Sequence, residues 1–172
     1  GTKTYDGNSS VQSSDLSLSG LISGETLSLS GAGTVSSSSV GSGKNITLGS
    51  LTLGNTGSGT ASNYTFGNTS FEVTQRVLNA SGSRNYNGSV DVNSSELTLS
   101  NLVGSESLAF SGTGTIGSAE IGNNKTVSLG SFTISNGSGA ASNYTISGGS
   151  FSLSVTARPL TLSGSRSYNG NT

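Results

Sequence analysis

Cysteine, histidine, methionine and tryptophan are absent from the 172-residue sequence, and proline occurs once. The chain can therefore form no disulfide, offers no thiol nucleophile, and lacks the residue that most often serves as metal ligand and general base. Small secreted eukaryotic domains often carry disulfides. A cysteine-free chain rich in Ser, Thr, Gly and Asn is more typical of a bacterial extracellular protein, and the lack of Cys and Met avoids oxidation outside the cell.

Charged residues are also scarce, at 9% of the chain, with a net charge of −1. No basic run is present, so we expect no nucleic-acid binding. No apolar run approaches the ~20 residues of a membrane span. No signal peptide opens the sequence, and we expect it to be a piece of a longer protein. Hydrophobic residues make up 30%, below the usual ~45–50%, which indicates a lean folded domain.

The sequence repeats itself. Tyr5-Asp6-Gly7 returns as Tyr86-Asn87-Gly88 and as Tyr168-Asn169-Gly170, at intervals of 81 and 82 residues. Residues 61–65, Ala-Ser-Asn-Tyr-Thr, return at 141–145. Tandem repeats of this kind usually serve a mechanical role and are rarely enzymes.

The repeat predicts three segments: a first module at residues 1–78, a second at 79–160, and the start of a truncated third at 161–172. No flexible spacer separates the modules, so we expect a stiff junction and an elongated, end-to-end pair. The trailing segment should be the first strand of a third module. Without its partners it is expected to be disordered or to pair along the exposed edge of the second module.

Apolar residues alternate with polar ones in short runs, a pattern typical of half-buried strands. The alternating positions are Leu16, Leu18, Leu27, Leu29, Ile46, Leu48, Leu51, Leu53, Tyr64, Phe66, Phe71 and Val73, and in the second copy Leu97, Leu99, Leu108, Phe110, Val127, Leu129, Phe132, Ile134, Tyr144, Ile146, Phe151 and Leu153. The phase slips at Gly49-Ser50, which indicates a bulge or a crossing between sheets.

Six or seven short strands per module predict an all-β fold of two tandem, small antiparallel β-sandwich (Ig-like) modules arranged end to end. A β-helix would repeat about every 20–25 residues, whereas Leu16, Leu27 and Ile46 are 11 and 19 residues apart. A β-grasp fold needs a helix that no segment supplies.

Charged residues that recur between the copies are candidates for chemical sites. They are Asp15/Glu96, Glu25/Glu106, Lys44/Lys125, Arg76/Arg158 and Arg84/Arg166, with Lys3 in the place of Arg84 in the first copy. Their spacing shows no pair of carboxylates suited to acid–base catalysis. We interpret them as surface or junction ion pairs, each worth about 0–1 kcal/mol.

Two further patterns resemble ligand sites and are interpreted as structural. Asp6-Gly7-Asn8 and Asp91-Val92-Asn93 imitate calcium ligands, but neither cluster recurs. Gly41-Ser42-Gly43-Lys44 resembles a phosphate loop, yet the second copy reads Gly-Asn-Asn-Lys at residues 122–125, which lacks the second glycine, and no helix follows. We predict no catalytic residue, no cofactor and no metal, and hence no enzyme.

The tyrosines recur at fixed places, either before a turn or at the start of a strand. They could form an aromatic platform for carbohydrate, or they could lie in the core or at a junction with the hydroxyl bonded at its edge. Recurrence in every module favours the second interpretation. The positions that we take as the structural signature of the repeat are Tyr5, Gly7, Lys44, Asn63, Tyr64, Arg76, Tyr86, Gly88, Lys125, Asn143, Tyr144 and Arg158.

These motifs, in order, resemble a known family. Tyr5-Asp6-Gly7, residues 40–44, residues 51–54, Asn63-Tyr64-Thr65 and residues 75–78 resemble the YDG-type repeat of large secreted bacterial adhesins, including those similar to filamentous haemagglutinin. The second copy carries Asn87 in place of Asp6, which indicates that turn formation matters more than the charge. The resemblance implies a stalk or passenger repeat on the surface of a Gram-negative bacterium, exported by a dedicated route, with no enzyme activity.

Three functional hypotheses therefore compete. The favoured one is a structural stalk or spacer that holds a distal binding domain away from the cell. Its partners would be neighbouring repeats of the same chain, with a glycan or host surface contacted through other domains. The alternative is an adhesive module that itself binds carbohydrate or a host surface, and the third is an enzyme.

Overall fold

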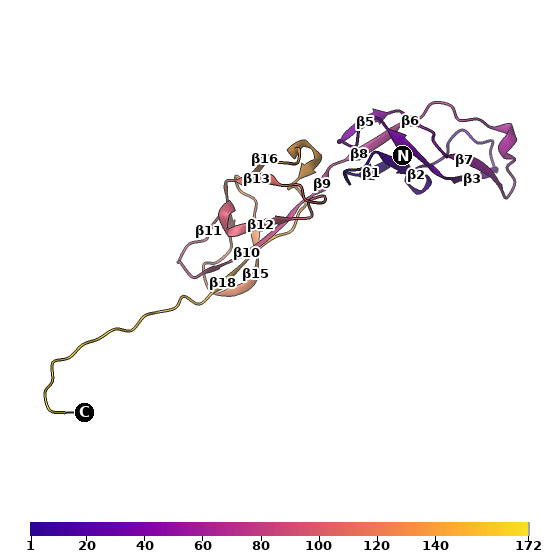
Figure 1. The fold of residues 1–172 in the computed structure, drawn as a ribbon. Coiled ribbons are helices and arrows are strands. Elements are labelled where there is room, and N and C mark those ends of the chain that lie inside the picture. The colour runs from indigo at the N-terminus through magenta and orange to yellow at the C-terminus, as the bar shows by residue number, and fades with distance from the viewer. Residues whose placement is uncertain (172) are drawn as a thin grey trace.

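A computed structural model describes residues 1–171; Thr172, the end of the predicted third repeat, lies outside the described residues. Within that range the helical structure is limited to four three-residue 3₁₀ turns, at Ser13–Asp15, Ala61–Asn63, Ser94–Glu96 and Ala141–Asn143. The remaining elements are short strands, so the prediction of an all-β fold is confirmed. Two modules follow one another along a long axis, and a tail leads away from the second (Figure 1).

The first module contains eight strands in three small sheets. They are β1 (Thr2–Thr4), β2 (Ser10–Gln12), β3 (Thr26–Ser30), β4 (Ala32–Val35), β5 (Gly41–Lys44), β6 (Ile46–Thr47), β7 (Thr52–Thr56) and β8 (Phe71–Thr74). The sheet orders are β1-β8-β5, β2-β4-β6 and β3-β7. Because β6 pairs with β4 whereas β7 pairs with β3, the phase slip at residues 49–50 carries the chain from one sheet to another.

The second module joins the corresponding strands into one larger sheet. Its strands are β10 (Asn79–Asn85), β11 (Asp91–Asn93), β12 (Leu97–Ser100), β13 (Leu108–Ser111), β14 (Thr113–Ile116), β15 (Gly122–Ser128), β16 (Thr133–Asn136), β17 (Tyr144–Thr145) and β18 (Phe151–Thr156). Six of them form a sheet in the order β11-β14-β15-β18-β10-β12, and β13 pairs separately with β16.

The first and last strands of each module run in parallel, which differs from the expected wholly antiparallel arrangement. β1 pairs with β8, and β10 pairs with β18, both in parallel register. Alternation of apolar residues reports which face is buried but not which strand is the neighbour. As a result of the parallel pairing, the chain enters a module at one end and leaves it at the other.

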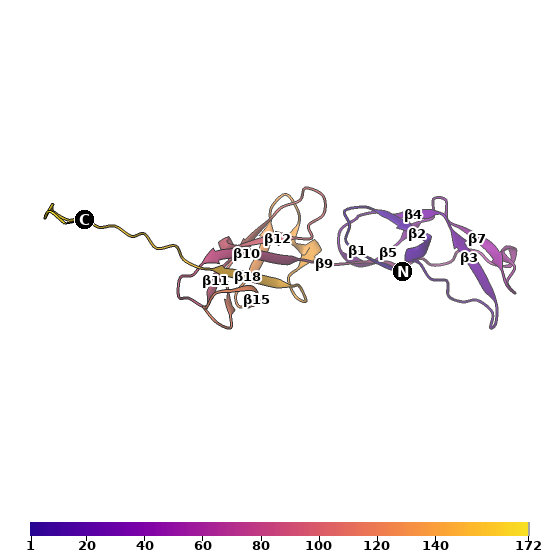
Figure 2. The ribbon, with the colours of Figure 1, turned by 90° about the horizontal axis from the view of Figure 1, so that it is seen from below.

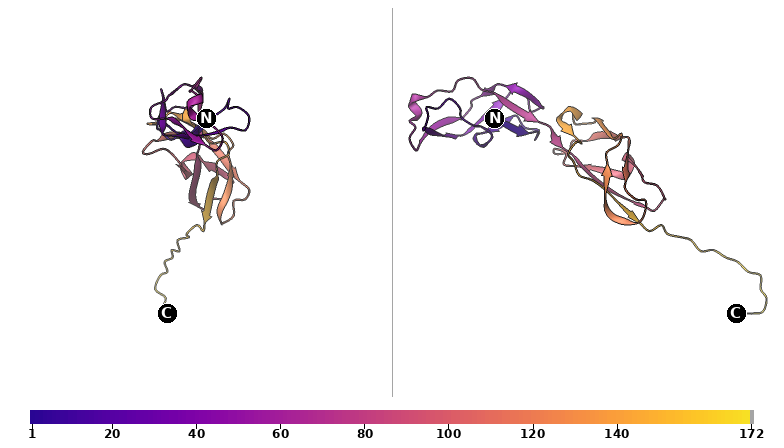
Figure 3. Two further views of the ribbon diagram at one scale, coloured as in Figure 1. Left: turned by 90° about the vertical axis from the view of Figure 1, so that its right-hand side faces the viewer. Right: turned by 180° about the vertical axis from the view of Figure 1, so that it is seen from behind.

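The modules are joined by one extended run rather than by a linker. β8, β9 (Arg76–Val77) and β10 follow one another with single-residue breaks at Gln75 and Leu78, and β9 pairs in parallel with β17 of the second module. In Figure 2, β9 bridges the space between the two sets of strands. The right-hand view in Figure 3 shows the same end-to-end order.

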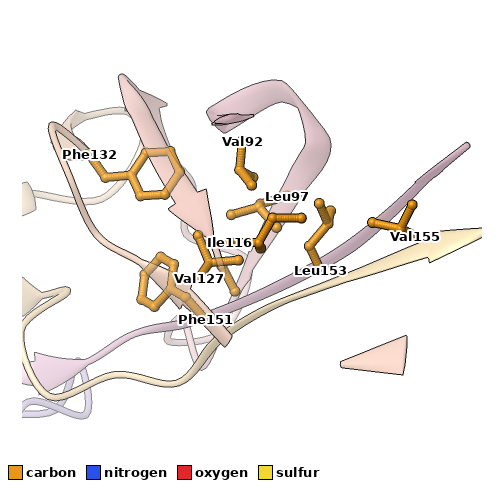
Figure 4. Close-up of a cluster of buried hydrophobic side chains, with 9 residues drawn as sticks. Val92, Leu97, Ile116, Val127, Phe132, Phe151, Leu153 and Val155 are labelled. Atoms are coloured by element: carbon orange, nitrogen blue, oxygen red, sulfur yellow. The ribbon is translucent and has the colours of Figure 1, made fainter. Parts of the chain in front are cut away.

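The core of the second module lies between its large sheet and the β13–β16 pair. Val92, Leu97, Ile116, Val127 and Leu153 are buried there together with Ala80, Phe132, Phe151 and Val155 (Figure 4). Phe110 of β13 packs on this cluster, with its ring centroid 4.8 Å from that of Phe132. The aromatic contacts therefore fasten the two-stranded pair to the sheet.

The order of the alternating apolar positions would pair Phe71 with Phe151, but the strand register gives a different pairing. Lys44 lies opposite Phe71 in the first module, and Lys125 lies opposite Leu153 in the second. The structural counterpart of Phe71 is therefore Leu153, and Phe151 takes the position of Thr69. The second copy has two extra residues before this strand, and the resemblance of the two phenylalanines conceals the shift.

Candidate functional site: the junction between the modules

Two signature tyrosines, one from each module, meet at the junction. Tyr5 follows β1 in the first module, and Tyr144 opens β17 in the second. Their rings pack edge to face, with centroids 5.4 Å apart and an interplanar angle of 81°. Both rings are buried, in a cluster that also contains Leu78 of the connecting run. The packing of two aromatic rings across the boundary gives the modules a common apolar contact.

One carboxylate holds both tyrosine hydroxyls. The Tyr5 hydroxyl donates to Glu106 Oε1 at 2.7 Å, and the Tyr144 hydroxyl donates to Glu106 Oε2 at 2.5 Å. The Val103 N–H donates to the Tyr144 hydroxyl at 3.0 Å. Burial, followed by the hydrogen bond to Glu106, raises the pKa of Tyr5 and raises the pKa of Tyr144 to about 12. Both hydroxyls are therefore protonated donors at neutral pH.

Arg76 fastens the connecting run to a loop of the second module. Its Nε donates to the Asn101 carbonyl at 2.7 Å, and its Nη2 donates to Asn101 Oδ1 at 2.6 Å. Asn101 returns a bond from Nδ2 to the Val77 carbonyl at 2.7 Å. Asn101 has a left-handed φ of 71°, a conformation that Asn tolerates better than most residues. This reciprocal set of bonds fixes the direction in which the strand enters the second module.

Two more contacts cross the boundary directly. The Val40 N–H of the first module donates to Asn143 Oδ1 of the second at 2.9 Å, and Asn143 is buried. A Cβ built on Gly7, which has a φ of +77°, would lie 2.9 Å from Val103 Cγ1. The turn glycine therefore both adopts a left-handed conformation and allows the second module to approach closely.

The Tyr-Asp/Asn-Gly motif itself forms an Asx turn. The N–H two residues on donates to the side-chain oxygen of Asp6 (2.9 Å), Asn87 (3.0 Å) and Asn169 (3.2 Å). Because Asp and Asn both accept this bond, either residue serves. Burial alone would raise the pKa of Asp6, but the hydrogen bonds from the Asn8 N–H and Lys3 outweigh it and lower the pKa.

In each of the two modules, a basic side chain stabilises this turn through hydrogen bonds to its backbone carbonyls. Lys3 Nζ bonds the carbonyls of Asn8 and Ser10 at 2.6 and 2.7 Å and lies 3.1 Å from Asp6 Oδ1. In the second module Arg84 bonds the carbonyls of Ser89 and Asp91 and lies 3.3 Å from Glu96 Oε1. Both side chains are more than nine-tenths buried.

The remaining recurrent charges also have structural roles. Asp15 and Glu96 accept the N–H of Gln12 and Asn93 and so close the 3₁₀ turns. Lys125 lies at the irregular register of β15 and donates to the Ser118 carbonyl, and Lys44 occupies the same position in β5. Glu25 accepts the Tyr64 hydroxyl, whose pKa is raised by that bond. The interpretation of Glu25 and Glu106 as members of ion pairs is therefore replaced by hydrogen bonds to tyrosine.

The other signature residues lie at the outer ends of the module pair. Asn63 and Tyr64 are at the end of the first module that faces away from the junction, and Tyr86 and Gly88 are at the far end of the second. Arg158 lies in the exposed tail. The junction thus joins the Tyr-Asp-Gly end of the first module to the Asn-Tyr-Thr end of the second. The Asn-Tyr-Thr end of the first module and the Tyr-Asn-Gly end of the second face away from the junction.

Sequence reasoning did not identify Asn101, Val103 and Val40 as junction residues. Glu106 could have been found, since it recurs with Glu25 at nearly the same distance before the Asn-Tyr-Thr motif. Among residues 1–171, no group of three or more His, Cys, Asp and Glu side chains is placed to hold a metal ion. None of the short helical turns in that range has the length and apolar character required to cross a membrane.

These features define a tandem β-repeat protein whose recurrent motifs build the contact between repeats. A family model described as the YDG domain matches residues 1–71 and again residues 72–151. The chain therefore belongs to the YDG domain family, and the predicted YDG-type repeat is confirmed. No curated protein and no solved structure matches the chain significantly.

Proposed function

We propose that this chain is a stalk or spacer segment of a secreted bacterial cell-surface adhesin. Each module would be a small β-sandwich, and successive modules would stand end to end to hold a distal binding domain away from the cell. The observation that carries the proposal is the continuous run from Phe71 to Asn85, which ends one module and begins the next. A strand shared in this way leaves no flexible hinge between modules.

The junction chemistry supports the same proposal. The recurrent polar residues at the junction form hydrogen bonds within the chain. Glu106 accepts from two tyrosines, and Arg76 donates to Asn101. Groups that are satisfied internally are poorly placed to recognise a ligand. The resemblance of the recurrent motifs to adhesin repeats points in the same direction.

Small-angle X-ray scattering on chains of different module number tests the proposal. A three-module chain can be made by placing a second copy of residues 75–156 after Thr156, because Ala157 occupies the position of Gln75. The maximum dimension should rise by a constant increment per module. A chain with four Gly/Ser residues inserted before Gln75 is the jointed control. If the unmodified chains scatter like that control, the spacer role fails.

The alternative, a module that itself binds carbohydrate, needs an exposed aromatic platform. Tyr5 and Tyr144 are buried against each other instead. A glycan array probed with the two-module chain should therefore remain silent. Binding that is lost in a Tyr86→Ala variant would favour the alternative, because Tyr86 is partly exposed.

A further inference from the structure

Asn-Gly dipeptides lose ammonia from the asparagine side chain more readily than other Asn pairs, because glycine places no side chain beside the attacking amide nitrogen. They occur here at residues 87–88, 136–137 and 169–170. The first two lie within the folded second module, Asn87 in the turn after β10 and Asn136 at the end of β16. Both of these dipeptides are exposed, so access to water does not distinguish them.

At Asn87 the two atoms that would react belong to one closed turn. The Ser89 N–H donates to Asn87 Oδ1 at 3.0 Å, and the ring that this bond closes contains both the Asn87 Cγ and the Gly88 nitrogen. The same bond stabilises the negative charge that develops on Oδ1 when a nucleophile adds to Cγ. The turn therefore presents an activated amide carbon to the nitrogen of the next residue.

The Gly88 nitrogen is free to act as that nucleophile. Its N–H has no hydrogen-bond acceptor among residues 1–171 and lies outside the strands. Because Gly88 is exposed, a base from the solvent can remove the amide proton. A Cβ built on Gly88 would come no closer than 3.9 Å, to the Tyr86 hydroxyl. Ring closure between Asn87 and Gly88 therefore meets no packed neighbour.

At Asn136 the same dipeptide is held in an unreactive arrangement. Asn136 Oδ1 accepts the N–H of Ala141, five residues on, at 2.8 Å, so it closes no short turn over its own peptide. The Gly137 N–H is engaged with the Gly139 carbonyl at 3.1 Å. A Cβ built on Gly137 would lie 2.4 Å from the Ser107 carbonyl oxygen. The fold thus protects this site, although both sites read Asn-Gly-Ser.

We propose that Asn87 is a site of spontaneous deamidation, which converts the Tyr-Asn-Gly of the second module into Tyr-Asp-Gly. The Gly88 nitrogen gives its proton to a solvent base and bonds to Asn87 Cγ. The Cγ–Nδ2 bond breaks, and Nδ2 takes up a proton and leaves as ammonia. Water then opens the succinimide ring, at Cγ to give aspartate or at the main-chain carbonyl to give isoaspartate. In sum water replaces ammonia, and no oxidant is required.

The aspartate product would find an environment that the first module already shows. There Asp6 occupies the same turn, with Oδ1 3.1 Å from Lys3 Nζ, and Arg84 takes the place of Lys3 in the second module. The reaction adds one negative charge to a chain whose net charge is −1. Isoaspartate would instead lengthen the backbone of the turn whose carbonyls Arg84 binds. The inference does not depend on the stalk function.

Incubation of the full chain at mildly alkaline pH in water enriched in heavy oxygen tests the proposal, because each opened succinimide takes up one oxygen from water. Trypsin digestion in ordinary water follows, and Lys125 separates Asn87 and Asn136 onto different peptides. Fragmentation in the mass spectrometer assigns the label to a residue. We expect residue 87 to gain label about tenfold faster than residue 136, as the loss of one or two hydrogen bonds' worth of assistance implies.

The chain unfolded in guanidinium chloride is the matched control, since only the local sequence then sets the rates, and the two sites should react at similar rates. Asn87→Gln should gain no label at that position with an unchanged circular dichroism spectrum, because the longer side chain cannot close the same ring. The proposal is overturned if residue 136 is labelled as fast as residue 87 in the folded chain, if residue 87 gains no label there, or if the difference persists in the unfolded chain.

Discussion

The second module has two strands that the first module lacks, although the sequences at those places nearly match. β12 covers residues 97–100 and β17 covers residues 144–145, whereas the equivalent residues 16–19 and 64–65 form no ladder. Tyr144 is buried while its counterpart Tyr64 is partly exposed, and Asn143 is buried while Asn63 is exposed. The two modules therefore differ in partners more than in sequence.

The difference teaches that the strands of the second module depend on the segment that leads into it from the first. β12 and β17 exist because residues 76–82 lie between them and supply the missing hydrogen bonds. An extended segment without a neighbour has no ladder to join, however well its apolar residues alternate. The ladder of the second module thus depends on the run that connects it to the first.

The largest expected effect comes from removing the buried anchor of that strand. Leu78→Ala should lower the unfolding free energy of the second module by about 2–5 kcal/mol, because Leu78 is fully buried. Val77→Ala, at the exposed neighbour, should change it by less than about 0.5 kcal/mol. Urea unfolding measures both. Equal effects for the two variants would mean that the second module does not rely on this strand.

The next effect tests whether Lys3 and Arg84 stabilise their turns in the same way. Arg84→Ala should cost about 1–3 kcal/mol, since it leaves two turn carbonyls without their donor and Glu96 without its cation. Arg84→Lys should recover much of that loss, because Lys3 supports the equivalent turn in the first module. Thermal unfolding of the three proteins provides the comparison. A lysine variant as unstable as the alanine variant would contradict the equivalence.

A smaller effect is expected where the junction uses one carboxylate twice. Glu106→Gln turns one acceptor oxygen into a donor amide, so one of the two tyrosine hydroxyls loses its partner, at about 1–2 kcal/mol. Glu25→Gln in the first module should have less effect, because Glu25 serves only Tyr64 and at a more exposed site. Denaturant unfolding monitors both. The reverse order would show that the junction contributes little.

Alkaline titration should distinguish Tyr144 at the junction from the other tyrosines of the chain. The pKa of Tyr144 is raised from 10.0 to about 12, so its contribution to stability is complete below pH 10 and is lost as the pH rises through 12. Tyrosinate absorbance should contain a late-titrating component that disappears in Tyr144→Phe. A titration curve that keeps this component in the variant would assign it to another tyrosine.

The smallest change expected is at the motif that names the family. Asn87→Asp restores the Tyr-Asp-Gly sequence in the second module and should alter stability by less than about 0.5 kcal/mol, because both side chains accept the Ser89 N–H. Asn87→Ala, which removes the acceptor, should be the more damaging of the two. Urea unfolding again decides the matter, and a large gain from Asp would show that the charge itself contributes.

The alternating apolar residues allowed the strands and the all-β class to be predicted from the sequence, because burial on one face imposes a period of two. They could not reveal that β1 and β8 run in parallel, since alternation carries no information on neighbours. Leu16 and Leu18 predicted a strand that the first module does not form, because residues 16–19 have no neighbour like the one that residues 79–82 provide for β12.

The site was predictable only in part for a related reason. Recurrence singled out Tyr5, Asn143 and Tyr144 as structural positions, and the structure brings these three together. That Tyr5 of one repeat meets Tyr144 of the next depends on the end-to-end placement of two folded units, which no local pattern encodes. The two-residue shift between Phe71 and Phe151 was hidden because a gap can be placed on either side of a conserved aromatic.

The parallel pairing of first and last strands also decides how the module bears tension. A pull on both ends of the chain draws β10 and β18 in opposite directions along their common axis. The ladder from Ala80–Phe151 to Asn85–Thr156 is then loaded in shear, so its hydrogen bonds share the force. In a hairpin pulled at its open ends they would break one after another. A module built in this way resists stretching most strongly along the direction in which the chain itself runs.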